Sequence, residues 1–260
     1  MYTFKLAFIS FTFLFAATAS ATDKFTFSVA EYPPFTTQTL ENQGLLSQIV
    51  TEAFALENKK VKFEFYPDAR ALELAKLGRV DGSVPWAKRS ERLEHFYYGE
   101  PVFKADDEVF FHKKGKKFHW NPNTQDFKAI ENYRIGAIIG FNYGKKFQEA
   151  EAKKLIQVIR LKQESQAFNM LNIDRIDLFI SPKTVGLYEL ANNLNSSERE
   201  KIGFTLAIQK PPSFDYLIIS KKAKRGKEAF EAMNRGLKKL KASGRYKEIR
   251  DEFNARLGAF

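Results

Sequence analysis

The 260-residue sequence contains no cysteine, and it has only three histidines and two tryptophans. The absence of thiols excludes a disulfide framework, thiol catalysis and an anchor attached through a processed cysteine. His95, His112 and His119 are scattered along the chain and lack the spacing of a zinc cluster. We therefore expect no metal site and no cofactor, and two ordinary apolar cores must supply the stability.

Long apolar stretches are also scarce, and the one at the N-terminus is short. Lys5 precedes an apolar run over residues 6–17, and the small residues 19–21 follow it. This order is typical of a signal peptide over residues 1–21. An N-terminal membrane anchor is the alternative, but a span needs about 20 apolar residues. Cleavage near Ala21 would leave 239 of the 260 residues as a secreted, periplasmic protein.

Acidic residues are outnumbered, with 31 Asp and Glu against 42 Lys and Arg, which gives a formal net charge of +11. A charge of this size can indicate binding to nucleic acid or to an anionic membrane. The cations are dispersed, however, and the basic runs at 113–117 and 221–225 have the character of solvated turns and helix starts. We therefore expect no nucleic-acid partner, although the charge still favours anionic small ligands.

Apolar alternation and helical periodicity take turns along the rest of the chain, which predicts an α/β fold. This order favours two units, each with a mainly parallel sheet covered by helices. Strands are expected at residues 25–30, 61–66, 108–111, 134–139, 155–160, 176–180, 204–208 and 216–220. Helices are expected after residue 44 and at 69–77, 145–154, 165–172, 224–242 and 245–257.

Residues 78–101 combine an aromatic ring with several cations. Trp86 stands close to Lys88, Arg89 and Arg92, and a Phe-Tyr-Tyr run follows at 96–98. Cations beside aromatic faces form a surface that can hold a small anionic or amphipathic ligand.

Short motifs in a characteristic order make the whole mature chain resemble the periplasmic solute-binding proteins of amino-acid-type ABC uptake systems. The motifs are Tyr32-Pro33-Pro34-Phe35, Gly44-Leu45-Leu46, Gly78-Arg79-Val80-Asp81, Ser90-Glu91-Arg92, Gly99-Glu100-Pro101, Ile135-Gly136 with the Gly140 loop, Asp174-Arg175-Ile176-Asp177 and Ser243-Gly244-Arg245-Tyr246. Each motif is only a few residues long, so their order and spacing carry the resemblance.

The resemblance implies a two-lobed binding-protein fold of the class II type. Lobe one would comprise residues 22–105 and 210–260, and lobe two residues 106–209. A small, carboxylate-bearing, amino-acid-like solute would bind in the cleft, and the lobes would close over it. The implied partner is an ABC permease in the inner membrane, and the binding protein would be a monomer.

Tyr32 and Phe35 lie in a loop that faces the cleft in this family and often stacks on the ligand. Aromatic rings offer large apolar contact area at low entropic cost, and Pro33 and Pro34 stiffen the loop. The alternative is that Phe35 fills the core of the lobe.

Arg92 falls where the family commonly places the arginine that binds a ligand carboxylate, since a guanidinium matches the planar carboxylate. A surface ion pair with Glu91 or Glu94 is the alternative, and Arg89 could be the residue in register instead. Trp86 is a candidate wall of the cleft or a core residue.

Arg70 lies at a predicted helix start, where the helix dipole disfavours a cation. It could contact the ligand or form a salt bridge with Asp68 or Glu73. In lobe two, the predicted helix start after Phe141, Asn142 and Tyr143 could bind an anion or stack on the ligand. A simple capped turn is the alternative.

One departure from the family pattern concerns the ligand. Amino-acid binders place an acid about five residues beyond the aspartate that corresponds to Asp177, where it receives the α-ammonium. Here that position is Pro182, between Ser181 and Lys183. A standard α-amino acid is therefore not the expected ligand, although Glu31 could supply a carboxylate from lobe one.

Some relatives with this fold are enzymes, namely periplasmic cyclohexadienyl dehydratases. Glu31, Asp68 or Asp106 could provide acid–base chemistry, but the sequence contains no recognisable catalytic pair. We predict a binding protein and not an enzyme. A protein that presents its ligand to a sensor receptor shares every one of these residue arguments.

Overall fold

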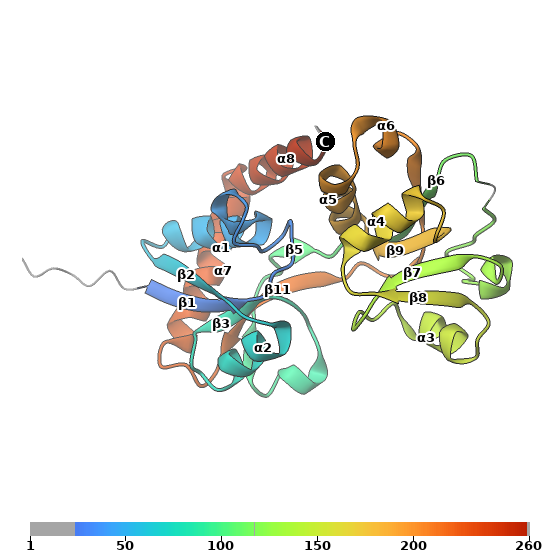
Figure 1. Ribbon diagram of the computed structural model, residues 1–260. Coiled ribbons are helices and arrows are strands. Elements are labelled where there is room, and N and C mark those ends of the chain that lie inside the picture. Colours follow the sequence, from blue (N-terminus) through green and yellow to red (C-terminus); the bar gives the residue numbers. More distant parts are fainter. Residues whose placement is uncertain (1–23, 117, 259–260) are drawn as a thin grey trace, which may run out of the picture.

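The computed structural model describes residues 24–116 and 118–258, and it contains two α/β lobes, each built around its own sheet (Figure 1). The predicted leader at residues 1–21 lies outside the described residues. None of the helices in the two described ranges combines the length and apolarity that crossing a membrane requires.

The sheet of the first lobe has the order β2-β1-β3-β11-β4, with β5 also paired to β11. Phe25 and Phe27 point from β1 toward α1 and α7, whereas Ser28 donates a hydrogen bond to the Ala71 carbonyl of α2 on the opposite face. The strands are β1 Lys24–Val29, β2 Lys60–Phe65, β3 Gly82–Ala87, β4 Phe96–Tyr98, β5 Phe103–Lys104 and β11 Phe214–Ser220. The helices are η1 Glu41–Gln43, α1 Leu45–Ala55, α2 Asp68–Lys76, η2 Ser90–Arg92, α7 Gly226–Ala242 and α8 Arg245–Gly258.

The sheet of the second lobe has the order β10-β6-β9-β7-β8. Phe111 and Phe179 pack with α4 on one face, and Phe110 packs with α3 and η3 on the other. The strands are β6 Glu108–Lys113, β7 Arg134–Ile138, β8 Gln157–Leu161, β9 Leu178–Pro182 and β10 Ile202–Leu206. The helices are η3 Phe127–Ile130, α3 Lys145–Ala152, α4 Glu164–Asn172, α5 Lys183–Asn193 and α6 Ser196–Arg199.

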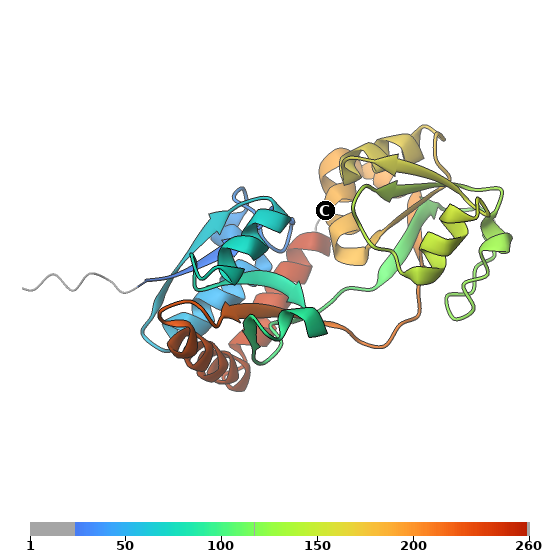
Figure 2. The same cartoon turned by 90° about the horizontal axis from the view of Figure 1, so that it is seen from below.

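Both sheets are mixed and not mainly parallel as the sequence predicted. β1 pairs in parallel with β2 and β3, and β7 with β8 and β9, but β11 and β6 pair antiparallel with their neighbours. The reason lies in the two crossings at residues 105–107 and 207–213, visible in Figure 2. β6 and β11 each follow a crossing, so they enter their sheet at the cleft and run away from it. The expected lobe boundaries at residues 105/106 and 209/210 fall within these crossings.

Helix α5 was absent from the sequence prediction. It follows Pro182 directly, and only Val185, Gly186 and Leu190 of its eleven residues are buried. This leaves little periodic signal. The helix matters because it faces the C-terminal helix α8 of the other lobe (Figure 1).

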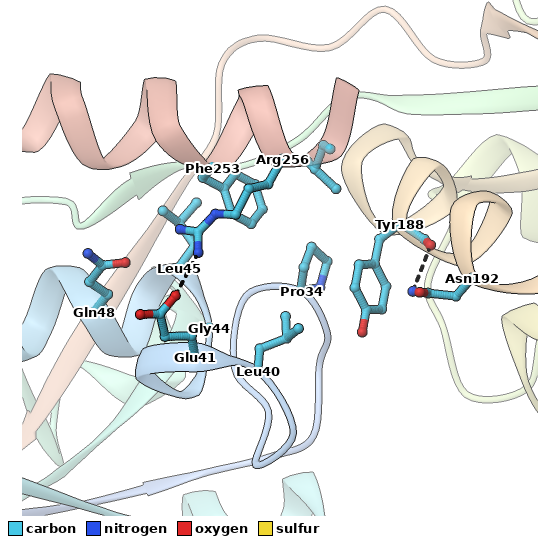
Figure 3. A pocket seen from close by; sticks show the side chains of 11 residues that line it. Pro34, Leu40, Glu41, Gly44, Leu45, Gln48, Tyr188, Asn192, Phe253 and Arg256 are labelled. Carbon is cyan, nitrogen blue, oxygen red and sulfur yellow. Dashed lines mark hydrogen bonds and ion pairs between the residues drawn. The ribbon is translucent and has the colours of Figure 1, made fainter. Parts of the chain in front are cut away.

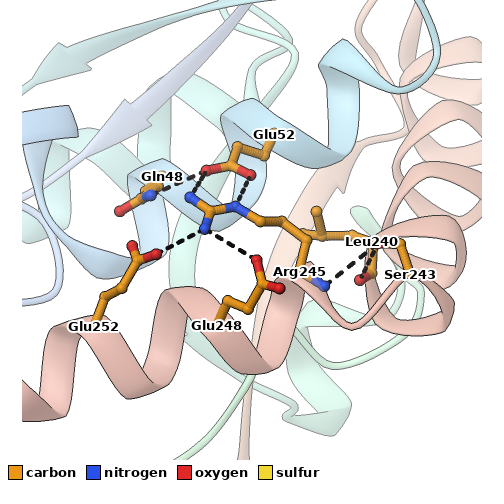
Figure 4. Close-up of polar contacts among 7 residues, drawn as sticks. All are labelled: Gln48, Glu52, Leu240, Ser243, Arg245, Glu248 and Glu252. Atoms are coloured by element: carbon orange, nitrogen blue, oxygen red, sulfur yellow. Dashed lines mark hydrogen bonds and ion pairs between the residues drawn. The ribbon is translucent and has the colours of Figure 1, made fainter.

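Helix α8 is fixed to the first lobe by a charge network around Arg245 (Figure 4). The Arg245 guanidinium donates to both carboxylate oxygens of Glu52 on α1, at 3.0 and 3.1 Å, and to Glu252 at 2.9 Å and Glu248 at 3.4 Å. The ring of Phe253 meanwhile packs 6.3 Å from that of Phe35. The Arg245 network thus fixes the start of α8 on α1, and the contact of Phe253 with Phe35 holds its later turns beside the cleft loop.

Gly236 tests the packing of α1 against α7. Replacing an interior helical glycine by alanine ordinarily stabilises a helix by up to about 1 kcal/mol. A Cβ at Gly236, however, would lie 1.9 Å from the Ala53 carbonyl oxygen. Gly236→Ala should therefore destabilise the protein by roughly 1–3 kcal/mol, measured by thermal denaturation. Lys238→Ala, on the exposed side of α7, should leave the melting temperature nearly unchanged. A stabilised Gly236→Ala variant would contradict the close approach.

Candidate functional site

A cavity of about 410 Å³ lies between the two lobes. Its walls come from the loops after β1, β3 and β7, the ends of β3 and β9, the start of α2, and the two crossing segments with the first residues of the strands that follow them. Because parallel strands end at the same edge of a sheet, the carboxyl ends of four strands converge here, which is where α/β folds generally bind ligands.

Aromatic side chains form the wall from the first lobe. Tyr32 and Phe35 lie in the loop after β1 with their ring centroids 5.4 Å apart, and Phe35 is only 3% exposed. Trp86, near the end of β3, donates from Nε1 to the Ser83 hydroxyl at 2.7 Å. The Arg92 guanidinium lies 4.6 Å from the centroid of the Trp86 ring. The indole is therefore held in place on two sides.

The second lobe contributes the loop between β7 and α3, and Phe141 and Asn142 line the cavity. Phe141 is 36% exposed. The Asn142 side-chain oxygen accepts a 2.9 Å hydrogen bond from the Gly144 amide, directly before α3. Tyr143 does not line the cavity. It is buried in the core, and its hydroxyl accepts a 2.8 Å hydrogen bond from the Ile138 amide. This bond ties the loop to the end of β7.

Carboxylates outnumber cations around the cavity. Among the described residues, two cations line it, Arg89 and Lys210, and five acids do so, namely Glu31, Asp68, Asp106, Glu108 and Asp215. The cavity is therefore acidic, although the whole chain is strongly basic. Composition had suggested the opposite, a preference for anionic ligands.

Three of these acids lie on or beside the crossing segments, where they are partly shielded from water. Burial raises the pKa of Asp215 to about 6, against an ordinary value of 3.8, and Lys210 opposes the shift. Burial also raises the pKa of Glu108, although the Lys210 ammonium pairs with it at 3.1 Å. Burial and then Asp215, Glu108 and Asp106 raise the pKa of the Tyr32 hydroxyl. The negative charges therefore act on one shared region.

Five of the eight residues predicted as ligand contacts line the cavity: Tyr32, Phe35, Trp86, Phe141 and Asn142. Tyr143, Arg70 and Arg92 do not. Arg70 is exposed on α2, while Asp68 at the helix start reaches the cavity. η2 turns Arg92 back so that it donates to the Ala87 carbonyl at 3.1 Å, and Arg89 takes the place at the cavity.

Pro182, which stands where amino-acid binders carry their acid, does line the cavity. Sequence reasoning missed the group formed by Glu108, Lys210 and Asp215. The available signal was position, because all three lie within six residues of a predicted lobe boundary. A chain that crosses a cleft must expose side chains to it.

A second, smaller cavity of about 160 Å³ lies beside the cleft (Figure 3). Pro34 and Phe253 from the first lobe face Tyr188 and Asn192 on α5 of the second. Because Pro34 belongs to the same loop as Tyr32, this loop separates the two cavities. This side of the cleft is where α5 comes closest to α8.

A family profile described as bacterial extracellular solute-binding proteins, family 3, matches residues 26–256. The chain belongs to this family. A search of curated protein sequences found no match.

Solved structures share the two-lobed fold. An ancestral arginine-binding protein bound to arginine matches with a TM-score of 0.64 and 19% identity, over 88% of this chain and 97% of its own. The second substrate-binding domain of Lactococcus lactis GlnP, in an open conformation, matches with a TM-score of 0.63 and 20% identity, over 88% and 94%. A histidine kinase sensor domain matches with a TM-score of 0.64 and 15% identity, over 87% and 95%. At these identities the likeness shows the fold.

Asp215 connects the cavity to stability. Burial favours the protonated form of Asp215. The free energy of unfolding therefore falls as the pH rises from about 4 to 6, and the destabilisation stays constant above pH 6. Asp215→Asn should therefore raise the melting temperature at pH 7.5 by roughly 2–5 °C, and the gain should vanish at pH 4. Asp107→Asn, at an exposed acid of the first crossing segment, is the control for lost charge. An equal gain at both pH values would contradict the burial of Asp215.

Proposed function

We propose that this protein captures a small solute in its interlobe cleft in the periplasm and delivers it to an ABC permease of the inner membrane. The observation that carries the proposal is a cavity lined by side chains from both lobes at the carboxyl ends of their strands. Membership of the solute-binding family supports it. The predicted leader, cleaved near Ala21, would take the protein across the inner membrane.

A ligand that contacts both lobes would change the form of the protein that the permease meets. The lobes are joined through two segments, residues 105–107 and 207–213, which can act as a hinge. A ligand that contacts Trp86 on one lobe and Phe141 on the other stabilises the closed arrangement by the contacts that only closure makes. The closed monomer would be the form that the permease recognises.

The ligand we propose is amino-acid-like, with a carboxylate for Arg89 and a body for the aromatic rings. Arg89 offers the planar donor pattern that suits a carboxylate, and Tyr32, Trp86 and Phe141 offer stacking faces. The arginine-bound structure with the same fold is consistent with this chemistry.

Phe141 tests the cleft as the binding site. Phe141→Ala removes an exposed ring from the wall of the second lobe, and it should weaken the best ligand from a screen of amino acids and amines about tenfold. Isothermal titration calorimetry measures the affinity. Phe204→Ala is the matched control, since this ring is 43% exposed on the same lobe but does not line the cavity. Equal affinities for the two variants would place binding elsewhere.

Arg89 and Arg92 provide a second test. If the ligand carries a carboxylate, Arg89→Ala should reduce its affinity about tenfold or more, because a charged hydrogen bond is lost. Arg92→Ala should have a smaller effect that acts through the orientation of Trp86. Calorimetric titration of both variants with the same ligand decides between the two residues. A larger loss of affinity in Arg92→Ala than in Arg89→Ala would show that Arg92, and not Arg89, binds the carboxylate.

A catalytic role is a second candidate, and Asp215 is the observation that favours it. A carboxyl group with a pKa near 6 can donate a proton at neutral pH, and it lines the cavity. We propose binding without turnover, and analysis of the bound solute after incubation would reveal any product. The sensor-domain likeness makes delivery to a receptor the other outcome of a partner search.

A further inference from the structure

The acidic side chains that line the cleft would repel a ligand whose only charged group is a carboxylate. We infer that the cleft takes an organic cation, whose positive charge faces the carboxylates of Asp106, Glu108 and Asp215 on or beside the two crossing segments. This inference rests on the proposed function and adds the substrate class to it.

The three carboxylates differ in how far the protein already satisfies them. Glu108 pairs with Lys210, and Asp106 accepts a hydrogen bond from the Thr184 amide at the start of α5. In the described part of the chain, the Asp215 carboxylate receives no hydrogen bond, although Lys210 and Asp106 both act on it electrostatically. Asp215 is therefore the carboxylate most available to a ligand.

The balance of charge favours a cation over an anion. The five acids and two cations that line the cavity in the described part of the chain leave three excess negative charges at full ionisation. Partly buried like charges are costly unless an opposite charge approaches. An anionic ligand would add to this repulsion, whereas an ammonium or guanidinium group would relieve it.

The arrangement suits an organic cation better than a metal ion. Among residues 24–116 and 118–258, no three histidine or acidic side chains come close enough together to hold a metal. The carboxylates instead share a cavity with the rings of Tyr32, Trp86 and Phe141, and aromatic faces attract organic cations. Trp86 already stacks on the guanidinium of Arg92.

The location of the acids also explains the proline at position 182. The second-lobe wall lacks an acid there, but Asp106 on the first crossing and Glu108 at the start of β6 line the same cavity, and Glu108 is paired with Pro182 in the register of β6 and β9. Acids on or beside the crossing segments thus supply the negative charge that the lobe wall lacks at position 182.

Matched ligands of different charge test the inference. Calorimetric titrations should use arginine against citrulline, which differ mainly in charge, together with agmatine, putrescine and choline as cations without a carboxylate, and glutamate and succinate as anions. We expect the best cation to bind at least tenfold more tightly than citrulline, glutamate or succinate. The combined Glu108→Gln and Asp215→Asn variant should lose at least tenfold in affinity for that cation. Asp107→Asn should bind it as the unmodified protein does.

The outcomes separate this inference from the proposed function. If citrulline or an anion binds as tightly as every cation, or if the double variant retains its affinity, the organic-cation assignment is wrong and solute binding stands. If no probe of any charge binds with a Kd below 10 mM, both the assignment and the binding function fail. Circular dichroism and thermal melting confirm that each variant is folded before it is titrated.

Discussion

The chain passes twice between the lobes, and this double crossing is the constraint on which the rest of the structure depends. It reverses β6 and β11 relative to the other central strands, and it makes each sheet mixed. It also brings residues from 105–108 and 210–215, about a hundred positions apart, to the floor of one cavity. Three of the five acids that line the cavity, Asp106, Glu108 and Asp215, therefore lie on or beside the segments that join the lobes.

This arrangement of acids has an electrostatic cost. Asp215 and Glu108 are held where burial favours their neutral forms, and among the described residues the direct ion pair to these two acids is the one between Lys210 and Glu108. A ligand that brings positive charge would relieve this cost at the segments that join the two lobes. The attraction between the ligand's positive charge and these acids would then favour both binding and the closed arrangement of the lobes.

The first lobe also reaches the second beside the cleft, through α8. The Arg245 network fixes α8 on α1, and Phe253 packs against Phe35 in the loop that lines the cleft. On the other side of the small cavity lies α5, whose second residue, Thr184, donates its backbone amide to Asp106. The crossing segment, the cleft loop and the α5–α8 approach are thus mechanically connected.

The alternation of strands and helices could be predicted from the sequence, because apolar periodicity is a local property of each segment. Tyr32, Trp86 and Phe141 were candidates from the sequence, and they line the cavity because they lie near the ends of strands at the cleft edge. The choice between Arg89 and Arg92 depended on one short turn of 3₁₀ helix, which the sequence pattern could not orient. Only the tertiary structure decided the charge of the cavity, because burial and the meeting of distant carboxylates at the crossings are properties of the assembled lobes, and no local pattern records them.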